Sequence, residues 1–230
     1  MRVQPLVLSV RAESVNAAGG EHSRVVSGRE RQGGDVLGLC RFCGGPIFIG
    51  QERFHLDDDH SSQDSGISTS SCPLCHLTQH LERPEIDREA TLIWLPELTQ
   101  GVLNALVWDI HLTLAKHGKP LCPDRRPVSG APPARVAASA YAALKDRGLA
   151  ALRRIGTTSP RDLAEALLRL SPSSYDRRAE LLGGARLLPL GRFLWNGRDV
   201  YPQLVETLKS NSKRQDISAA RRLQEKDLTQ

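Results

Sequence analysis

Hydrophobic residues are spread unevenly along the chain, and the first half predicts two short strands followed by one long helix. The apolar runs at residues 6–10 (LVLSV) and 91–95 (TLIWL) are short, which is typical of strands. Pro96 then suits the first turn of a helix. Residues 98–116 predict an amphipathic, core-facing helix that ends near Gly118. Its predicted inward positions, which recur every three or four residues, are Leu98, Val102, Ala105, Leu106, Asp109, Ile110 and Thr113.

The second half of the chain predicts mostly helices. Five prolines between residues 119 and 133 indicate a linker, and the alanine-rich residues 134–155 indicate a helix interrupted at Gly148. Ser159 is a typical N-cap and Pro160 a typical first-turn residue of a helix through Leu170. The remaining expected segments are a helix over 175–182, an extended segment over 186–195, a late helix over 200–208 and a polar tail after Ser210.

The composition is that of a folded globular protein, with 40% hydrophobic and 25% charged residues. Aromatic residues are only 4%, so the core must consist largely of Leu, Val and Ala, which favours helices. No apolar run approaches the roughly 20 residues of a membrane-spanning helix. The first ten residues also lack the length of a secretory signal, because Arg11 and Glu13 follow them.

Charge divides the chain into two unlike halves. Residues 1–119 carry 15 acidic and 11 basic side chains, whereas residues 120–230 carry 11 acidic and 20 basic ones. The basic half could meet nucleic acid, acidic lipid head groups or an acidic protein segment, or could be a solvated surface. Binding to nucleic acid is not favoured, because the chain lacks interleaved aromatic residues and a recognisable recognition helix.

Two C-x-x-C pairs, Cys40 with Cys43 and Cys72 with Cys75, are the strongest chemical signal in the sequence. Two residues between thiolates let a tight turn point both sulfurs at one cation, and two such turns complete a tetrahedron. Four thiolate ligands leave no open position, so the sequence predicts one structural Zn²⁺. A redox role would need a thioredoxin-like setting and disulfides an oxidising compartment, and neither is visible. Cys122 is expected to be a free thiol.

The residues around these pairs resemble the HNH, or ββα-metal, fold in its four-cysteine form over about residues 38–82. The order is a knuckle, a strand ending in Asp59 and His60, a loop, a second strand, a knuckle and a helix with His76. In an active nuclease of this kind, Asp59 and His76 would hold a divalent cation and His60 would deprotonate water. His80, expected one helical turn beyond His76, could serve as the ligand instead.

The sequence departs from the nuclease pattern at residues 66–68 (GIS), where the asparagine that orients the base is missing. The acidic run at 57–59 also repels phosphate unless a bound cation neutralises it. The alternative role for Asp59 and His60 is a hydrogen-bonded pair retained for packing. We therefore expect a catalytically degenerate domain with no catalytic residues, and a metal-dependent HNH endonuclease using Asp59, His60 and His76 is the alternative.

A longer set of segments resembles the IcmJ/DotN family of type IVB secretion and related conjugative systems. The segments are CRFCG (40–44), HLDDDH (55–60), CPLCH (72–76), IWLPELTQGVLN (93–104) and, further on, RLLPLGRF (186–193). The resemblance implies a cytoplasmic subunit of a type IV coupling complex, associated peripherally with the inner membrane through its partners. It implies docking on a coupling ATPase and contacts with other coupling-complex subunits, and a domain that is a zinc-built scaffold.

Together these observations predict an α+β fold, with a small HNH-like ββα zinc-knuckle domain followed by a mainly helical region. The expected organisation is an N-terminal strand and linker (1–37), the zinc domain with its following strand and helix (38–118), a proline-rich linker (119–133), a helical region (134–210) and a charged tail (211–230).

Overall fold

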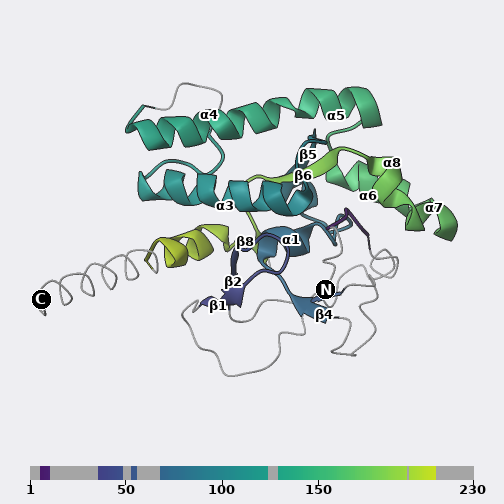
Figure 1. Ribbon diagram of the computed structural model, residues 1–230, viewed down its shortest axis with the longest axis horizontal. Helices are drawn as coiled ribbons and strands as arrows, with labels where there is room; N and C mark the ends of the chain where they lie inside the picture. The colour runs from purple at the N-terminus through teal and green to yellow at the C-terminus, as the bar shows by residue number, and fades with distance from the viewer. Residues whose placement is uncertain are drawn as a thin grey trace, which may run out of the picture.

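The computed structural model describes residues 6–10, 36–48, 53–55, 68–123, 129–195 and 197–210. In this part of the chain, helices combine with small two-stranded antiparallel sheets (Figure 1). The structure therefore confirms the predicted mixture of helix and sheet. The predicted tail after Ser210 lies outside the described residues.

The central sheet pairs β5 (Ala90–Trp94) with β6 (Ala185–Pro189), with Leu92 opposite Leu187. This pairing confirms the predicted strand near residues 91–95 and the extended segment after 186. It also joins residues that lie on opposite sides of the proline-rich segment at 119–133.

Both free edges of this sheet are hydrogen-bonded. On the β5 side, the Leu92 N–H donates to the Thr158 carbonyl at 2.8 Å and the Trp94 N–H to the Arg147 carbonyl at 3.2 Å. On the β6 side, the Gln100 side chain exchanges two hydrogen bonds of 2.8 Å with the backbone of Leu187. A sheet of two strands can be buried here because neighbouring segments satisfy its backbone.

Helix α3 (Gln100–Lys116) is the long helix that the sequence predicts, but it begins two residues later. Thr99 is the N-cap, and its side chain accepts a hydrogen bond from the Val102 N–H. The helix stops at Lys116, before Gly118, whose φ of +63° suits a helix end.

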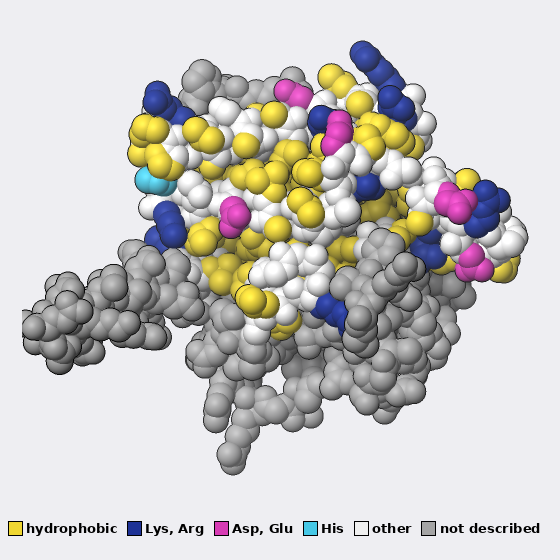
Figure 2. All heavy atoms as spheres, in the orientation of Figure 1, with side chains coloured by type: hydrophobic (Ala, Val, Ile, Leu, Met, Phe, Trp, Pro, Cys, Tyr) yellow, Lys and Arg dark blue, Asp and Glu magenta, His cyan; other side chains and the backbone are white. Residues whose placement is uncertain are grey.

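The predicted inward face of α3 is largely wrong. Val102 is 51% exposed, Leu106 is 37% exposed, and Asp109 also faces solvent, whereas Ile110 is buried as expected. Figure 2 shows hydrophobic side chains over α3 and its neighbours. The residues that face the interior are Gln100, Gly101, Leu103, Asn104, Val107, Trp108, Ile110, His111 and Leu114. Apolar residues lie on several sides of this helix, and three of the buried positions are polar, so hydrophobic spacing alone selected the wrong stripe.

The helical second half starts with α4 (Pro132–Asp146) and α5 (Gly148–Ile155), which confirms the predicted break at Gly148. Helix α4 lies along α3, and α5 packs on β5 (Figure 1). Helix α6 (Pro160–Leu168) begins as predicted, because the Ser159 hydroxyl accepts a hydrogen bond from the Asp162 N–H at 3.1 Å. It ends two residues before the predicted Leu170.

The region after α6 differs from the prediction in one place. The single helix expected over 175–182 is two short helices, α7 (Pro172–Asp176) and α8 (Arg178–Leu182), which meet at Arg177. The late helix is confirmed, because residues 201–210 are helical. The other short elements after residue 80 are α2 (Ile86–Glu89), β7 (Leu194–Trp195) and β8 (Arg198–Asp199).

The strand predicted over residues 6–10 is wrong. This segment makes two backbone hydrogen bonds, from the Ser9 N–H to the Thr78 carbonyl at 2.9 Å and from the Leu81 N–H to the Ser9 carbonyl at 3.2 Å. Its partner is the turn region after residue 77 and not an extended strand, so no ladder forms. The Tyr175 hydroxyl holds the end of the segment by donating to the Val10 carbonyl at 2.9 Å.

Two clusters of buried side chains make the core, and each draws on both halves of the chain. One surrounds Cys72 and Cys75 and includes Trp108 from α3 and Tyr201 from the late helix. The other surrounds the β5 and β6 pair on its opposite side. The cysteines therefore lie within the main core of the molecule.

Candidate metal centre

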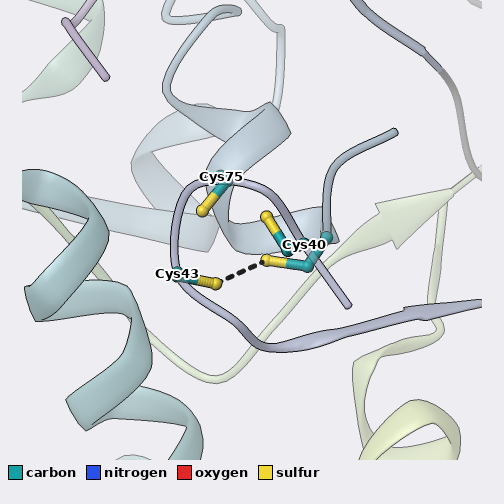
Figure 3. A group of neighbouring side chains, drawn as sticks. Cys40, Cys43 and Cys75 are labelled. Atoms are coloured by element: carbon teal, nitrogen blue, oxygen red, sulfur yellow. Dashed lines mark hydrogen bonds between the residues drawn. The ribbon is translucent and has the colours of Figure 1, made fainter. Parts of the chain in front are cut away.

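The four cysteines that the sequence singles out meet at one point. Their Sγ atoms all lie within 4.8 Å of one another, and none forms a disulfide. Cys40, Cys72 and Cys75 are buried and Cys43 is half-buried, and the side chains labelled in Figure 3 point toward a common centre. The Sγ atoms of Cys43 and Cys72 are 3.4 Å apart.

These separations fit the donor set of a tetrahedral metal ion. Four sulfurs at the usual zinc–sulfur distance of about 2.3 Å lie about 3.8 Å from each other. The observed cluster is within an ångström of that arrangement without any change of backbone. The residues are thus compatible with a metal site.

The first pair lies in a tight turn between β1 (Val36–Leu39) and β2 (Pro46–Phe48). The Cys40 N–H donates to the Gly45 carbonyl at 2.7 Å, and the Gly44 N–H donates to the Cys40 carbonyl at 2.8 Å. Gly44 has a φ of +68°, a backbone angle that residues with a side chain rarely adopt. The Gly45 N–H also points at the Cys43 Sγ, 3.2 Å away.

The second pair lies where β4 (Ser68–Ser70) passes into α1 (Pro73–Leu77). Cys72 is the N-cap of α1, and Pro73 begins the helix. The N–H groups of Cys75 and His76 donate to the Cys72 carbonyl at 3.1 and 2.9 Å. One helical turn therefore places the two sulfurs on the same side.

Helix α3 supplies hydrogen-bond donors to the second pair. Asn104 Nδ2 lies 3.3 Å from the Cys75 Sγ, and Trp108 Nε1 lies 3.5 Å from the Cys72 Sγ. Gln100 Nε2 donates to Asn104 Oδ1 at 3.0 Å, which turns the amide nitrogen of Asn104 toward sulfur. N–H groups aimed at sulfur favour the thiolate and orient it for a cation.

Sequence reasoning missed these three residues. Their spacing was visible, because Gln100, Asn104 and Trp108 recur every four residues on one side of the predicted helix. Counting these polar residues among the inward-facing positions would have identified the buried side of α3.

Two glycines let α3 and the first knuckle touch. A Cβ at Gly45 would lie 2.7 Å from Trp108 Cδ1, and a Cβ at Gly101 would overlap the Phe42 carbonyl oxygen. Neither position has room for a side chain, so the knuckle lies directly against the start of α3.

The four thiols do not ionise alike. A hydrogen bond with Cys43 is the main influence that lowers the pKa of Cys40, whereas burial raises the pKa of Cys72. Four thiolates this close together would repel one another, and a bound divalent cation would offset this repulsion.

His76 and His80 form a buried pair beside the cysteines. Helix α1 ends at Leu77, so His80 is not on the helix as predicted, but the two Nε2 atoms still lie 3.2 Å apart. His80 Nδ1 lies 3.1 Å from a carboxylate oxygen of Glu82. A carboxylate only accepts, so Nδ1 of His80 donates; with His80 neutral, its Nε2 accepts and Nε2 of His76 is the donor.

Asp59 and His60, the other two residues of the nuclease hypothesis, lie outside the described residues. The structure therefore locates His76 and the four cysteines but not the complete set predicted from the HNH pattern.

Comparison with known proteins finds no match to a family model or to a curated protein. Among the described helices, none is both long and apolar enough to cross a membrane.

Proposed function

We propose that this chain is a structural zinc-binding adaptor subunit of a type IVB secretion or conjugation coupling complex. In this proposal it docks on a coupling ATPase, helps to recruit substrates, and reaches the inner membrane from the cytoplasm through its partners. The observation that carries the proposal is the closed four-cysteine cluster, which lies in the core and receives donors from α3. A buried site with four sulfur ligands and no open position suits a scaffold.

The segments that resemble the IcmJ/DotN family support the same reading. They place the two knuckles, the residues of β5 and the start of α3 in the order of that family. The order of β3 (Arg53–His55), β4 and α1 also agrees with the ββα arrangement of an HNH-like domain. In this reading the metal fixes the relative positions of the first knuckle, α1 and α3, and thereby builds a rigid surface for partners.

The alternative is a metal-dependent HNH endonuclease, and the buried histidine pair is the observation that favours it. Two imidazole nitrogens 3.2 Å apart, one of them oriented by Glu82, are spaced like neighbouring ligands of one cation. Against it, each of these nitrogens already serves as the hydrogen-bond partner of the other. The asparagine that would orient a base is also absent from residues 66–68.

A combined experiment tests both functions. The tagged chain is purified from its own host under reducing conditions, its metal content is measured, and the co-purified proteins are identified. We expect about one zinc per chain and a coupling ATPase that is lost when Cys72→Ser is used as bait. Absence of any coupling ATPase would overturn the adaptor proposal.

A cleavage assay addresses the alternative. We expect plasmid DNA to stay intact with magnesium, manganese or nickel. Cleavage that disappears in His60→Ala and in His76→Ala, but not in the matched control His117→Ala on an exposed position, would establish the nuclease instead.

The opposite charges of the two halves suggest that they contact different subunits of the complex. A pull-down in which the intact chain loses every partner after charge reversal of exposed arginines of the second half, Arg153→Glu and Arg169→Glu, would contradict this division. Nucleic acid stays a disfavoured partner, and salt-sensitive binding to DNA or RNA would restore it.

A further inference from the structure

A small cleft separate from the cysteine centre lies where four segments meet. The N-terminal segment, the start of α3, helix α8 and the start of β6 line a volume of about 140 Å³. Its lining residues are Leu6, Val7, Leu8, Thr99, Gln100, Ala179, Leu182, Gly183, Ala185 and Arg186. Most of these side chains are aliphatic, and Arg186 is the charged one.

Arg186 is held rigidly, but by carbonyl groups alone. Its Nε donates to the Leu98 carbonyl at 2.7 Å, and its Nη1 donates to the carbonyls of Gly183 and Ala185 at 3.0 and 2.7 Å. Nη2 donates to no residue in the described part of the chain, and no carboxylate pairs with the guanidinium there. Burial lowers the pKa of Arg186, which is the direction expected when no acidic group offsets the loss of hydration.

This arrangement contrasts with the buried Arg83. Arg83 forms a two-pronged ion pair with Glu89, with distances of 3.1 and 3.0 Å. Largely buried cations are normally compensated by an anion in this way. Arg186 carries the same positive charge and is partly buried, but no carboxylate of the described residues pairs with it. Its side chain lines the cleft.

Other residues of the cleft also favour a negatively charged group. Thr99 and Gln100 belong to the N-terminal end of the 17-residue helix α3, where the backbone dipoles favour negative charge. Leu6 and Val7 are half-buried and offer aliphatic surface in the same cleft. The volume is below the roughly 300–1,000 Å³ of a typical ligand pocket, so it suits one or two residues of a peptide.

We propose that this cleft binds an aliphatic carboxylate presented by a peptide, with Arg186 pairing with the carboxylate and the leucine and alanine side chains contacting the hydrocarbon. The carboxylate comes either from a peptide C-terminus or from a Glu side chain. This inference does not depend on the proposed adaptor function, because it rests on Arg186 and its cleft.

The test follows the Arg186 side chain by NMR in protein labelled with ¹⁵N-arginine. The probes are the peptide acetyl-Ala-Ala-Val-Leu with a free C-terminus, the same peptide as its C-terminal amide, an amidated peptide with an internal Glu, and sodium sulfate. We expect saturable shifts of the Arg186 Nε–H signal with the free acid or the Glu peptide, and none with the neutral amide. The comparison of the first and third probes identifies the source of the carboxylate.

Two variants check the location. Arg186→Lys keeps a positive charge but loses the planar fork, and we expect it to weaken binding by about ten-fold or more. Ala179→Leu narrows the cleft from an exposed position on α8 and leaves Arg186 itself unsubstituted, so weaker binding by this variant tests the location even if Arg186→Lys does not fold. Arg161→Lys, an exposed arginine paired with Asp87, is the matched control and should bind like wild type.

Three results obtained with the wild-type protein would overturn the proposal. They are no saturable shift up to about 10 mM peptide, equal shifts with the neutral amide, and binding of sulfate as tight as that of the free acid. Unchanged binding by Ala179→Leu would equally exclude this cleft as the site.

Discussion

The cysteine centre and the Arg83–Glu89 ion pair are both buried polar clusters that tie together distant parts of the chain. In the first, four thiols from two turns face one point, and α3 supplies two N–H donors. In the second, Glu89 accepts from Arg83 and also from the Leu194 N–H at 2.6 Å, while Arg83 donates to the Leu194 carbonyl at 3.0 Å. The guanidinium also lies 4.9 Å above the ring of Phe193.

The two clusters balance charge in different ways. Arg83 and Glu89 cancel each other's charge within the chain, and both also form hydrogen bonds with the backbone of Leu194. The cysteine centre has no such cation among the described residues, so we expect an ion from solution to supply the positive charge. We therefore expect the first cluster to respond to chelation and the second only to substitution.

The largest expected effect comes from breaking the cysteine centre. Cys72→Ser, or removal of the metal by a chelator at neutral pH, should unfold the knuckles and the parts of the core packed on them. Structural zinc in small domains contributes on the order of 10–16 kcal/mol of apparent binding free energy. Thermal unfolding followed by circular dichroism measures the loss, and Cys122→Ser is the matched control, which should melt like wild type.

If Cys72→Ser and the chelated protein melt at the temperature of the untreated wild type, the cysteine cluster is not a metal site. In that case the contrast between the two clusters disappears.

The next largest effect should come from removing one partner of the Arg83–Glu89 ion pair. Glu89→Ala should lower the free energy of unfolding by about 3–5 kcal/mol, because it leaves the buried Arg83 unpaired and frees the Leu194 N–H. Denaturant titration measures the change. The matched control is Glu165→Ala in the exposed pair with Arg169, for which a change of less than about 1 kcal/mol is expected.

The double variant Arg83→Met with Glu89→Leu sharpens this comparison. It should cost less than the sum of the single substitutions, since neither partner is left charged and alone. Additive losses would show that the two side chains act independently.

A smaller effect should follow from removing an N–H group of α3 that donates a hydrogen bond to a cysteine sulfur. Asn104→Leu keeps the size of the side chain but deletes the N–H group near Cys75, and we expect metal affinity to fall by about 10–100-fold. Competition with a metal-binding dye measures the affinity. Asp109→Asn, on the exposed side of the same helix, should change nothing. An unchanged affinity in Asn104→Leu would mean that the contact only fills space.

The smallest effect concerns His111, a buried polar group outside both clusters. Burial lowers its pKa to about 3, and Nδ1 lies 2.8 Å from the Tyr201 hydroxyl. Because the unfolded chain protonates near pH 6.5 and the folded one does not, stability is complete above pH 6.5 and falls as pH drops toward 3. The expected slope is at most about 1.4 kcal/mol per pH unit.

Unfolding experiments between pH 6.5 and 5 measure this slope, and His111→Gln should reduce it by removing the titrating group. Equal slopes in the variant and the wild type would contradict this assignment. The control is the exposed His117→Gln, which should leave the slope unchanged.

Local signals in the sequence were sufficient for some of these features. The C-x-x-C spacing identified the four cysteines, Ser159 and Pro160 marked the start of α6, and the apolar run near residue 91 marked β5. In each case the physical cause lies within a few residues: a turn that aims two thiols, a capped first turn, or a short β-prone stretch. Such features survive any tertiary arrangement that leaves the segment folded.

The tertiary structure alone decided which face of α3 is buried, what residues 6–10 pair with, and where Arg83 finds its partners. Gln100 bonds to Leu187 and His111 to Tyr201, each about 90 residues away along the chain. Hydrophobic periodicity cannot register such contacts, because a buried polar residue becomes favourable only when a distant group completes its hydrogen bonds. The sequence by itself therefore determined which four cysteines could hold a metal ion, and only the fold determined their surroundings.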